Sequence, residues 1–317
     1  YESHAERCCF FRNTACSGGA VYSGTLRACA LTDNVAYSYG GGTYETSLYS
    51  CTVTDNSAGY SGGGLYEGSA TNSIVYYNRT GGWGRNYTGS EFAYSCTEPR
   101  PSGDANVVSP PLLASASHLS AASPCRGAGI GTGLSGSDLD GEAWSVPPSI
   151  GCDELVSGCA TSSLSVSIHS QYTAATIGGR LRFRADITGQ TTGSVWRWGD
   201  GTCTSNGPFA SHVFLSNGTY EVQLVAYNDS HPEGVTDAVT VTIGERMTHY
   251  VAIGNTDPMA PYTSWATAAT GIQDAIDAVC QLGALVLVSN GVYRADVQPG
   301  PVRYRVTVPE GLTVESV

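Results

Sequence analysis

The chain has 317 residues, a net charge of −12 at pH 7 and a pI near 4.8, and only 13% of its residues are charged. This balance excludes a basic surface for nucleic-acid phosphates, and no apolar run reaches the length of a membrane span. Every cation is Arg, so chemistry that needs a lysine amine is also excluded. Eleven Cys among many Gly, Ser, Thr and Tyr predict an oxidising, extracellular setting.

Residues 8–78 contain an internal repeat. Three copies read CCFFRNTACSGGAVY, CALTDNVAYSYGGGTY and CTVTDNSAGYSGGGLY, and a fourth, weaker copy ends at Asn78 with Ser73 in place of Cys. The period is 21 or 22 residues, and each clear copy carries a Gly cluster. A fixed period of this length predicts a solenoid. Short Val/Leu/Tyr/Thr runs broken by Gly, Asn and Ser predict short strands, and hence a right-handed parallel β-helix.

Coils stacked about 4.8 Å apart place equivalent residues above one another. We therefore predict three structural ladders, formed by Asn13, Asn34, Asn56 and Asn78, by Tyr22, Tyr44 and Tyr66, and by Cys8, Cys29 and Cys51. Stacked Asn amides would hydrogen-bond one another inside the coils. The Tyr column predicts aromatic stacking on the solenoid wall, with a sugar-binding platform as the alternative. The Cys column fits either disulfides or a buried thiol ladder.

The residue before each ladder Asn forms a further column, made of Arg12, Asp33, Asp55 and Tyr77. Two carboxylates one coil apart, about 5 Å, have the separation of a retaining glycosidase pair. An outward column in which Arg12 compensates Asp33 explains the same residues, and no His or third carboxylate recurs beside them. The sequence has no nucleophile elbow or phosphate loop, and its six His lack metal-ligand spacing. We therefore predict no catalytic, cofactor or metal site.

After Asn78 the repeat dissolves into irregular coils and then a Pro/Ser/Gly-rich segment. The ending of this segment reads D-x-D-G at 138–141 and P-x-I-G-x-D-E at 148–154. It resembles the C-terminal cap of bacterial secreted β-helix proteins, which often carry cell-surface anchoring regions. The resemblance covers residues 8–154 and implies a fold rather than an activity. Asp138-x-Asp140-Gly141 has part of a calcium-loop pattern, but the other ligands are missing, which favours a turn held by Asx hydrogen bonds.

A small, polar linker at residues 155–163 precedes a segment with a period of two. In RLRFRADI (180–187) apolar and polar residues alternate, which predicts a strand with one buried and one wet face. The segment WRWGDG (196–201), followed by GTYEVQLVAYN, resembles the PKD domain, an Ig-like β-sandwich. Arg197 and Trp198 stand where the family pattern W-D-F-G-D-G has Asp and Phe, which puts any role of that Asp in doubt.

The last part of the chain contains the one convincing helix. Its apolar positions follow i, i+3, i+4 spacing: Ile272, Ala275, Ile276, Val279 and Cys280. Gly283 follows as a C-terminal cap, and a buried strand is predicted from Ala284 to Val288. Further strands end at LTVESV. This order resembles the N-terminal cap and first coil of a β-helix of the same secreted family.

The sequence thus predicts an all-β protein of three parts: parallel β-helix coils with a C-terminal cap (1–155), a PKD-like sandwich (164–246) and the N-terminal cap of a further β-helix (248–317). The open solenoid ends predict a non-enzymatic, extracellular structural or adhesive protein that forms fibres by head-to-tail stacking. The alternative is a carbohydrate-binding or carbohydrate-degrading surface protein. The expected partners are copies of the chain or adjacent repeats, and glycans, without nucleic acid, membrane span or cofactor.

Cysteine pairing and glycosylation complete the expectations. Eleven Cys is an odd number, so at least one thiol is free or pairs with another chain. The candidate pairs by position are Cys96–Cys125 and Cys152–Cys159. The candidates for a free thiol are Cys203 and Cys280. Four sequons predict N-glycans where the source has the machinery, at Asn78, Asn86, Asn217 and Asn228.

Overall fold

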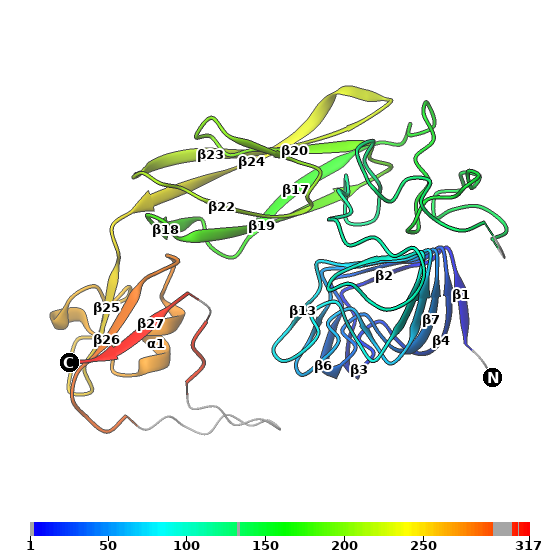
Figure 1. Cartoon of the computed structure of the whole chain (residues 1–317). Coiled ribbons are helices and arrows are strands. Elements are labelled where there is room, and N and C mark those ends of the chain that lie inside the picture. The colour runs from blue at the N-terminus through cyan, green and yellow to red at the C-terminus, as the bar shows by residue number, and fades with distance from the viewer. Residues whose placement is uncertain (1–2, 132–133, 294–305, 310) are drawn as a thin grey trace.

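The computed structural model describes residues 3–131, 134–293, 306–309 and 311–317. Three parts follow one another along the chain: a parallel β-solenoid with a loop-rich segment against it, a β-sandwich, and a terminal unit with one short helix (Figure 1). The predicted all-β fold is confirmed. Among the helices of the described residues, none is long and apolar enough to cross a membrane.

The solenoid consists of parallel strands in three sheets. The first sheet contains β1 (His4–Glu6), β4 (Val21–Arg27), β7 (Thr43–Tyr49), β10 (Leu65–Tyr66), β11 (Ser69–Thr71), β14 (Tyr87–Thr88) and β15 (Glu91–Ala93). The second sheet contains β2 (Cys9–Phe11), β5 (Ala30–Thr32), β8 (Thr52–Thr54), β12 (Ile74–Tyr76) and β16 (Cys96–Thr97). The third sheet contains β3 (Thr14–Ser17), β6 (Val35–Tyr39), β9 (Ser57–Ala58) and β13 (Arg79–Thr80).

The corner between the second and third sheets explains the repeated motif. The residue before each ladder Asn has a left-handed backbone conformation, with φ between 54° and 60°; these residues are Arg12, Asp33, Asp55 and Tyr77. Asp tolerates this conformation better than most residues, because its short polar side chain can bond locally. The turn directs the following Asn into the interior of the coil. The backbone conformation therefore fixes the position of this column. The side chains of the column are not needed to form the turn and can make other contacts.

Glycine clusters lie where the third sheet turns towards the first. A Cβ atom on Gly41 would meet the carbonyl oxygens of Gly63 and Ser57, which belong to the next coil. Coils at the strand spacing leave no room for a side chain there. The interior below is filled by aliphatic residues and one aromatic ring: Leu26, Leu31, Leu48, Val53, Leu65, Val75 and Phe92.

The segment after the last regular coil covers the solenoid in two places. Residues 98–107 continue the coils and bridge back to Cys96. The flank segment, residues 107–131 and 134–154, lies along the outer face of the second sheet, beside β2 in Figure 1. The hydroxyl of Thr54 donates to a flank-segment carbonyl at 2.8 Å, and that of Thr52 accepts a flank-segment N–H at 3.0 Å. The cap expected at the end of the solenoid therefore also covers its side.

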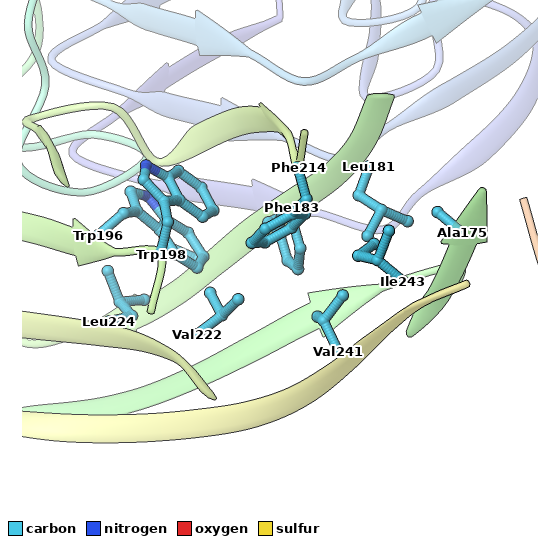
Figure 2. Close-up of a cluster of buried hydrophobic side chains, with 11 residues drawn as sticks. Ala175, Leu181, Phe183, Trp196, Trp198, Phe214, Val222, Leu224, Val241 and Ile243 are labelled. Atoms are coloured by element: carbon cyan, nitrogen blue, oxygen red, sulfur yellow. The ribbon is translucent and has the colours of Figure 1, made fainter. Parts of the chain in front are cut away.

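The sandwich packs two sheets around an aromatic core (Figure 2). One sheet contains β17 (Ser165–Ser170), β19 (Arg180–Thr188) and β22 (Phe209–Val213). The other contains β18 (Ala174–Thr176), β24 (His231–Gly244), β23 (Gly218–Asn228), β20 (Gly193–Arg197) and β21 (Cys203–Ser205). The rings of Trp196 and Trp198 stack 5.4 Å apart beside Phe183. Trp198 thus fills the core from the position where the PKD pattern has Phe, whereas Arg197 is exposed.

The terminal unit is a parallel sheet with one helix. Its elements are β25 (Thr248–Val251), η1 (Trp265–Thr267), α1 (Ile272–Asp277), β26 (Leu285–Val288) and β27 (Thr313–Ser316). The sequence predicts a helix that reaches Cys280, but α1 ends at Asp277. The chain leaves the helix early because the Gln281 side chain bonds the backbone of Glu245 and Met247 at 2.8 Å each. That this unit caps a further β-helix stays a prediction.

Candidate functional site

The Asn ladder runs through the solenoid interior. The amide of Asn13 donates to Asn34 Oδ1 at 2.9 Å, Asn34 to Asn56 at 2.8 Å, and Asn56 to Asn78 at 3.0 Å. Asn86, which the repeat alignment does not include, extends the ladder by accepting from Asn78 at 3.3 Å. The amides from Asn34 to Asn86 are buried and bonded on both sides, so they face no ligand.

The four sequons differ in their exposure to solvent. The side chains of Asn78, Asn86 and Asn228 are each 3% exposed and hydrogen-bonded in the interior. Asn217 is exposed in the sandwich. A glycan on any of the three buried amides would replace bonds that hold the fold, so Asn217 is the one sequon that the folded chain can present.

The Cys column lies against the interior as free thiols. The Cys8 N–H donates to the sulfur of Cys29 at 3.5 Å, and the Cys51 N–H donates to the hydroxyl of Ser73 at 3.0 Å. Ser73 therefore takes the place of a Cys without breaking the ladder. All eleven Cys are free thiols in the structure, so neither Cys96–Cys125 nor Cys152–Cys159 is a disulfide, although Cys96 and Cys125 share one buried cluster.

The Tyr column stacks its rings on one another. The ring centroids of Tyr22 and Tyr44 lie 4.8 Å apart and those of Tyr44 and Tyr66 lie 5.2 Å apart, with nearly parallel planes. A sugar ring that stacks on an aromatic side chain needs a free ring face. Both faces of Tyr44 are already used, and the side chain of Tyr22, at the end of the column, is 60% exposed. The column is a structural ladder along most of its length.

A second group of aromatic side chains includes one residue on the third sheet and two just after its strands. Tyr37, Tyr60 and Trp83 are 68%, 63% and 84% exposed. An open groove of about 420 Å³ crosses the third sheet, and Tyr37 lines it. Tyr37 stands at one side of this groove, and the equivalent positions in the next two coils are Gly59 and Gly81. The sequence does not single out these residues, because they break the repeat; that interruption is the signal that could have found them.

The two candidate glycosidase carboxylates are both ion-paired. Asp33 Oδ2 lies 3.1 Å from Arg12 Nε and 2.6 Å from Arg184 Nη1, which belongs to the sandwich. Asp55 Oδ1 lies 2.8 Å from Arg79 Nη2, and burial raises the pKa of Asp55 to about 6. A sugar substrate would have to displace the sandwich to reach this pair. The geometry therefore favours the ion-pairing interpretation over the catalytic one.

Ser115, His118 and Asp140 form a hydrogen-bonded chain in the flank segment. The distances are 2.6 Å from Ser115 Oγ to His118 Nδ1 and 2.9 Å from His118 Nε2 to Asp140 Oδ2, an order shared with hydrolase triads. Ser115 is only 1% exposed, and its hydroxyl also accepts the His118 N–H at 3.2 Å. Burial lowers the pKa of His118, but the neighbouring carboxyl groups Asp140 and Asp153 outweigh it and raise the pKa overall. The chain stabilises a buried turn.

Two groups of flank-segment side chains bring ligand atoms within 4.8 Å of one another and could hold a cation. They are His118, Asp140 and Asp153, and Asp138, Glu142 and Asp153. Asp138 Oδ1 accepts the N–H groups of residues 140–142 at 2.8–3.0 Å, which is the predicted Asx turn, and Oδ2 accepts the Glu154 N–H at 2.8 Å. Burial raises the pKa of Asp153 to about 7 and also raises that of Glu142, so protons can neutralise this cluster.

Comparisons with known proteins identify one domain. Residues 170–243 match the PKD domain family, so the resemblance of the sandwich is confirmed. No curated protein matches the chain. A chitinase from Paenibacillus sp. str. FPU-7, described as bacterial cell-surface-expressed multi-modular enzyme machinery, aligns with 95% of this chain at 10% identity and a TM-score of 0.20. This chain spans 28% of that protein's length, and so low a TM-score carries no argument.

Proposed function

We propose that this chain is an extracellular adhesive module that binds glycans in the groove across the third sheet. The supporting observation is the exposed ring of Tyr37 in the groove beside Gly59 and Gly81, which carry no side chain; exposed Tyr60 and Trp83 follow the next two strands of the same sheet. Tyr and Trp combine a large apolar ring with a polar group, which suits a wet binding surface. A PKD domain and an acidic, Lys-free composition are compatible with an extracellular location.

The groove also supplies polar contacts. Ser57 and Thr80 line it with hydroxyl groups, and Arg79 lines it with a guanidinium that Asp55 already neutralises. A neutral sugar chain therefore fits this surface better than an anionic one. The groove is open, so we propose an internal stretch of a polysaccharide as the ligand. We propose binding without hydrolysis, because the nearest carboxylates are committed to Arg side chains.

A glycan array tests this proposal. The chain is expected to bind a neutral polysaccharide, and Tyr37→Ala is expected to weaken binding roughly tenfold, equivalent to about 1.4 kcal/mol. Trp265→Ala is the matched control, because Trp265 is an exposed aromatic of the terminal unit. Equal losses in both variants, or no binding to any neutral glycan, would contradict the proposal. A reducing-sugar assay on the bound glycan distinguishes binding from degradation.

Head-to-tail assembly is a second candidate. In the described residues β1, β2 and β3 are the outermost strands of the three sheets, and such edges can pair with another chain. At the other end residues 98–107 occupy the coil position, so stacking would be made onto them. Sedimentation velocity at rising concentration tests this candidate. Thr14→Lys, which adds a charge to the exposed edge strand β3, is expected to abolish any concentration-dependent species.

A further inference from the structure

The sandwich contacts the solenoid through the face of β19 that the sequence predicts to be wet. Figure 1 shows β19 and β22 on the side of the sandwich that faces the solenoid. Arg184 and Asp186 alternate with buried residues on β19, and both reach across to the solenoid corner that precedes the Asn ladder. On β22 the ring of Phe209 lies 5.5 Å from that of Tyr77, centroid to centroid.

The ion pairs across this contact are complementary in both directions. Arg184 Nη1 of the sandwich lies 2.6 Å from Asp33 Oδ2 and 3.7 Å from Asp55 Oδ2 of the solenoid. Asp186 Oδ2 of the sandwich lies 3.3 Å from Arg12 Nη2 of the solenoid. Arg184 and Asp186 also pair with each other, with Nε and Oδ1 3.0 Å apart. The solenoid presents two acids and one base to one acid and one base of the sandwich, and Arg79 of the solenoid compensates the additional carboxylate, Asp55, at 2.8 Å.

We infer that the column Arg12, Asp33, Asp55 and Tyr77 is the docking surface for the chain's own sandwich. The column needs a left-handed backbone at each position, yet its side chains include a cation, two carboxylates and an aromatic ring, and contacts from each type to the sandwich are present. Asp33, Asp55 and Arg184 are all largely buried at the contact. Removing one member of such a pair leaves an uncompensated, partly buried charge, which is strongly unfavourable.

Docking fixes the sandwich beside the proposed glycan groove. Arg79 belongs to both features, because it lines the groove and lies 2.8 Å from Asp55 of the docking surface. Domains joined by a short polar linker move relative to one another unless an interface holds them. The ion pairs therefore convert two linked domains into one rigid body, with the groove of the third sheet at a set angle to the sandwich. This role does not depend on whether the groove binds a glycan.

Small-angle X-ray scattering of the full chain tests the docking surface. Arg184→Glu places a third carboxylate against Asp33 and Asp55, and is expected to raise the radius of gyration as the sandwich moves away. Arg184→Glu combined with Asp33→Arg restores an opposite-charge pair and is expected to return the radius towards that of the wild type. Arg180→Glu is the control, because Arg180 lies on the same strand and its guanidinium donates to Ser211 within the sandwich at 3.1 Å.

Two measurements keep the result interpretable. Fluorescence of the buried Trp196 and Trp198 reports whether the sandwich is still folded in each variant. Arg184→Gln removes the charge without reversing it and serves if the Glu variant does not fold. A radius of gyration that is unchanged in both Arg184 variants would overturn the inference. So would a wild-type profile that already matches the open form, or an equal expansion in the Arg180→Glu control.

Discussion

Asn56 shows what one ladder residue contributes to the solenoid. Its amide nitrogen donates to the carbonyls of Leu31 and Thr54 and to Asn78 Oδ1, and its Oδ1 accepts from the Asn34 side chain and backbone. Asn56→Ala leaves several buried groups without a partner, each worth about 1–3 kcal/mol. We expect a loss of roughly 3 kcal/mol in the free energy of unfolding, measured by urea denaturation.

Asn13 provides the control for this measurement. It is exposed and lies at the outer end of the ladder, where it donates to Asn34. Water can replace a partner at an exposed position, so Asn13→Ala is expected to cost less than about 1 kcal/mol. Equal losses at Asn13 and Asn56 would show that the ladder does not depend on burial.

Asp153 makes the stability of the flank segment depend on pH. Burial raises its folded pKa to about 7, although His118 and the Leu119 N–H lower it, whereas an unfolded Asp has a pKa of about 3.9. The folded state therefore holds the proton over a range in which the unfolded state has lost it. The contribution of Asp153 to the free energy of unfolding is therefore fully present below about pH 4 and is lost as the pH rises to about 7, a difference of up to about 4 kcal/mol.

Asp153→Asn isolates this effect. Asn cannot ionise, and its carbonyl oxygen can still accept the Leu119 N–H that Asp153 accepts at 2.7 Å. We expect a shallower fall in stability between about pH 4 and pH 7 than in the wild type, measured by thermal unfolding at several pH values. A stability that rises with pH over this range in the wild type would contradict the assignment.

At the level of the structural element, the glycine corner sets the distance between coils. A Cβ atom on Gly41 would meet the carbonyl oxygens of Gly63 and Ser57, which are backbone atoms that cannot move away easily. Gly41→Ala is expected to destabilise the solenoid by about 1–3 kcal/mol, the usual cost of overpacking. Gly207→Ala is the control, since a Cβ there would meet nothing within 4 Å. Chemical denaturation of both variants gives the comparison.

The coils could be predicted from the sequence because their contacts repeat. The 22-residue spacing of Asn34 and Asn56 reappears as a direct side-chain hydrogen bond, and the alternation in residues 180–187 reappears as β19. The early end of α1 could not be predicted, because it depends on bonds from Gln281 to residues far away in the chain. Local pattern thus determines the elements, whereas tertiary contacts determine where some of them end.

The candidate sites were less predictable for the same reason. Tyr37 has no aromatic counterpart in the next two coils, so a search for repeated columns passes over it. Arg184 and Asp186 have the pattern of a solvated strand face, and the sequence contains nothing that shows the solenoid against that face. The Ser115–His118–Asp140 chain joins loop residues with no common period. Sites whose residues come from different coils or different domains cannot be recognised from the spacing of residues in the sequence.

At the scale of the whole molecule, the sandwich and the terminal unit share a boundary at Leu282. Its N–H donates to the Ala174 carbonyl at 2.9 Å, its carbonyl accepts the Thr176 N–H at 3.1 Å, and its side chain packs against the sandwich core. Residues of the terminal unit thus extend the β18 edge of the sandwich. The two units are expected to lose stability together when this side chain is removed.

Leu282→Ala tests this coupling, with an expected cost of about 2 kcal/mol, the lower end for a Leu→Ala change because the side chain is only partly buried. Hydrogen exchange followed by mass spectrometry should show faster exchange both in β18 of the sandwich and in β26 of the terminal unit. Leu215→Ala is the control, because Leu215 is exposed in the sandwich and its loss should alter neither. Faster exchange confined to β26 would mean that the stability of the sandwich does not depend on the terminal unit. The contact at Leu282 would then not couple the stabilities of the two units.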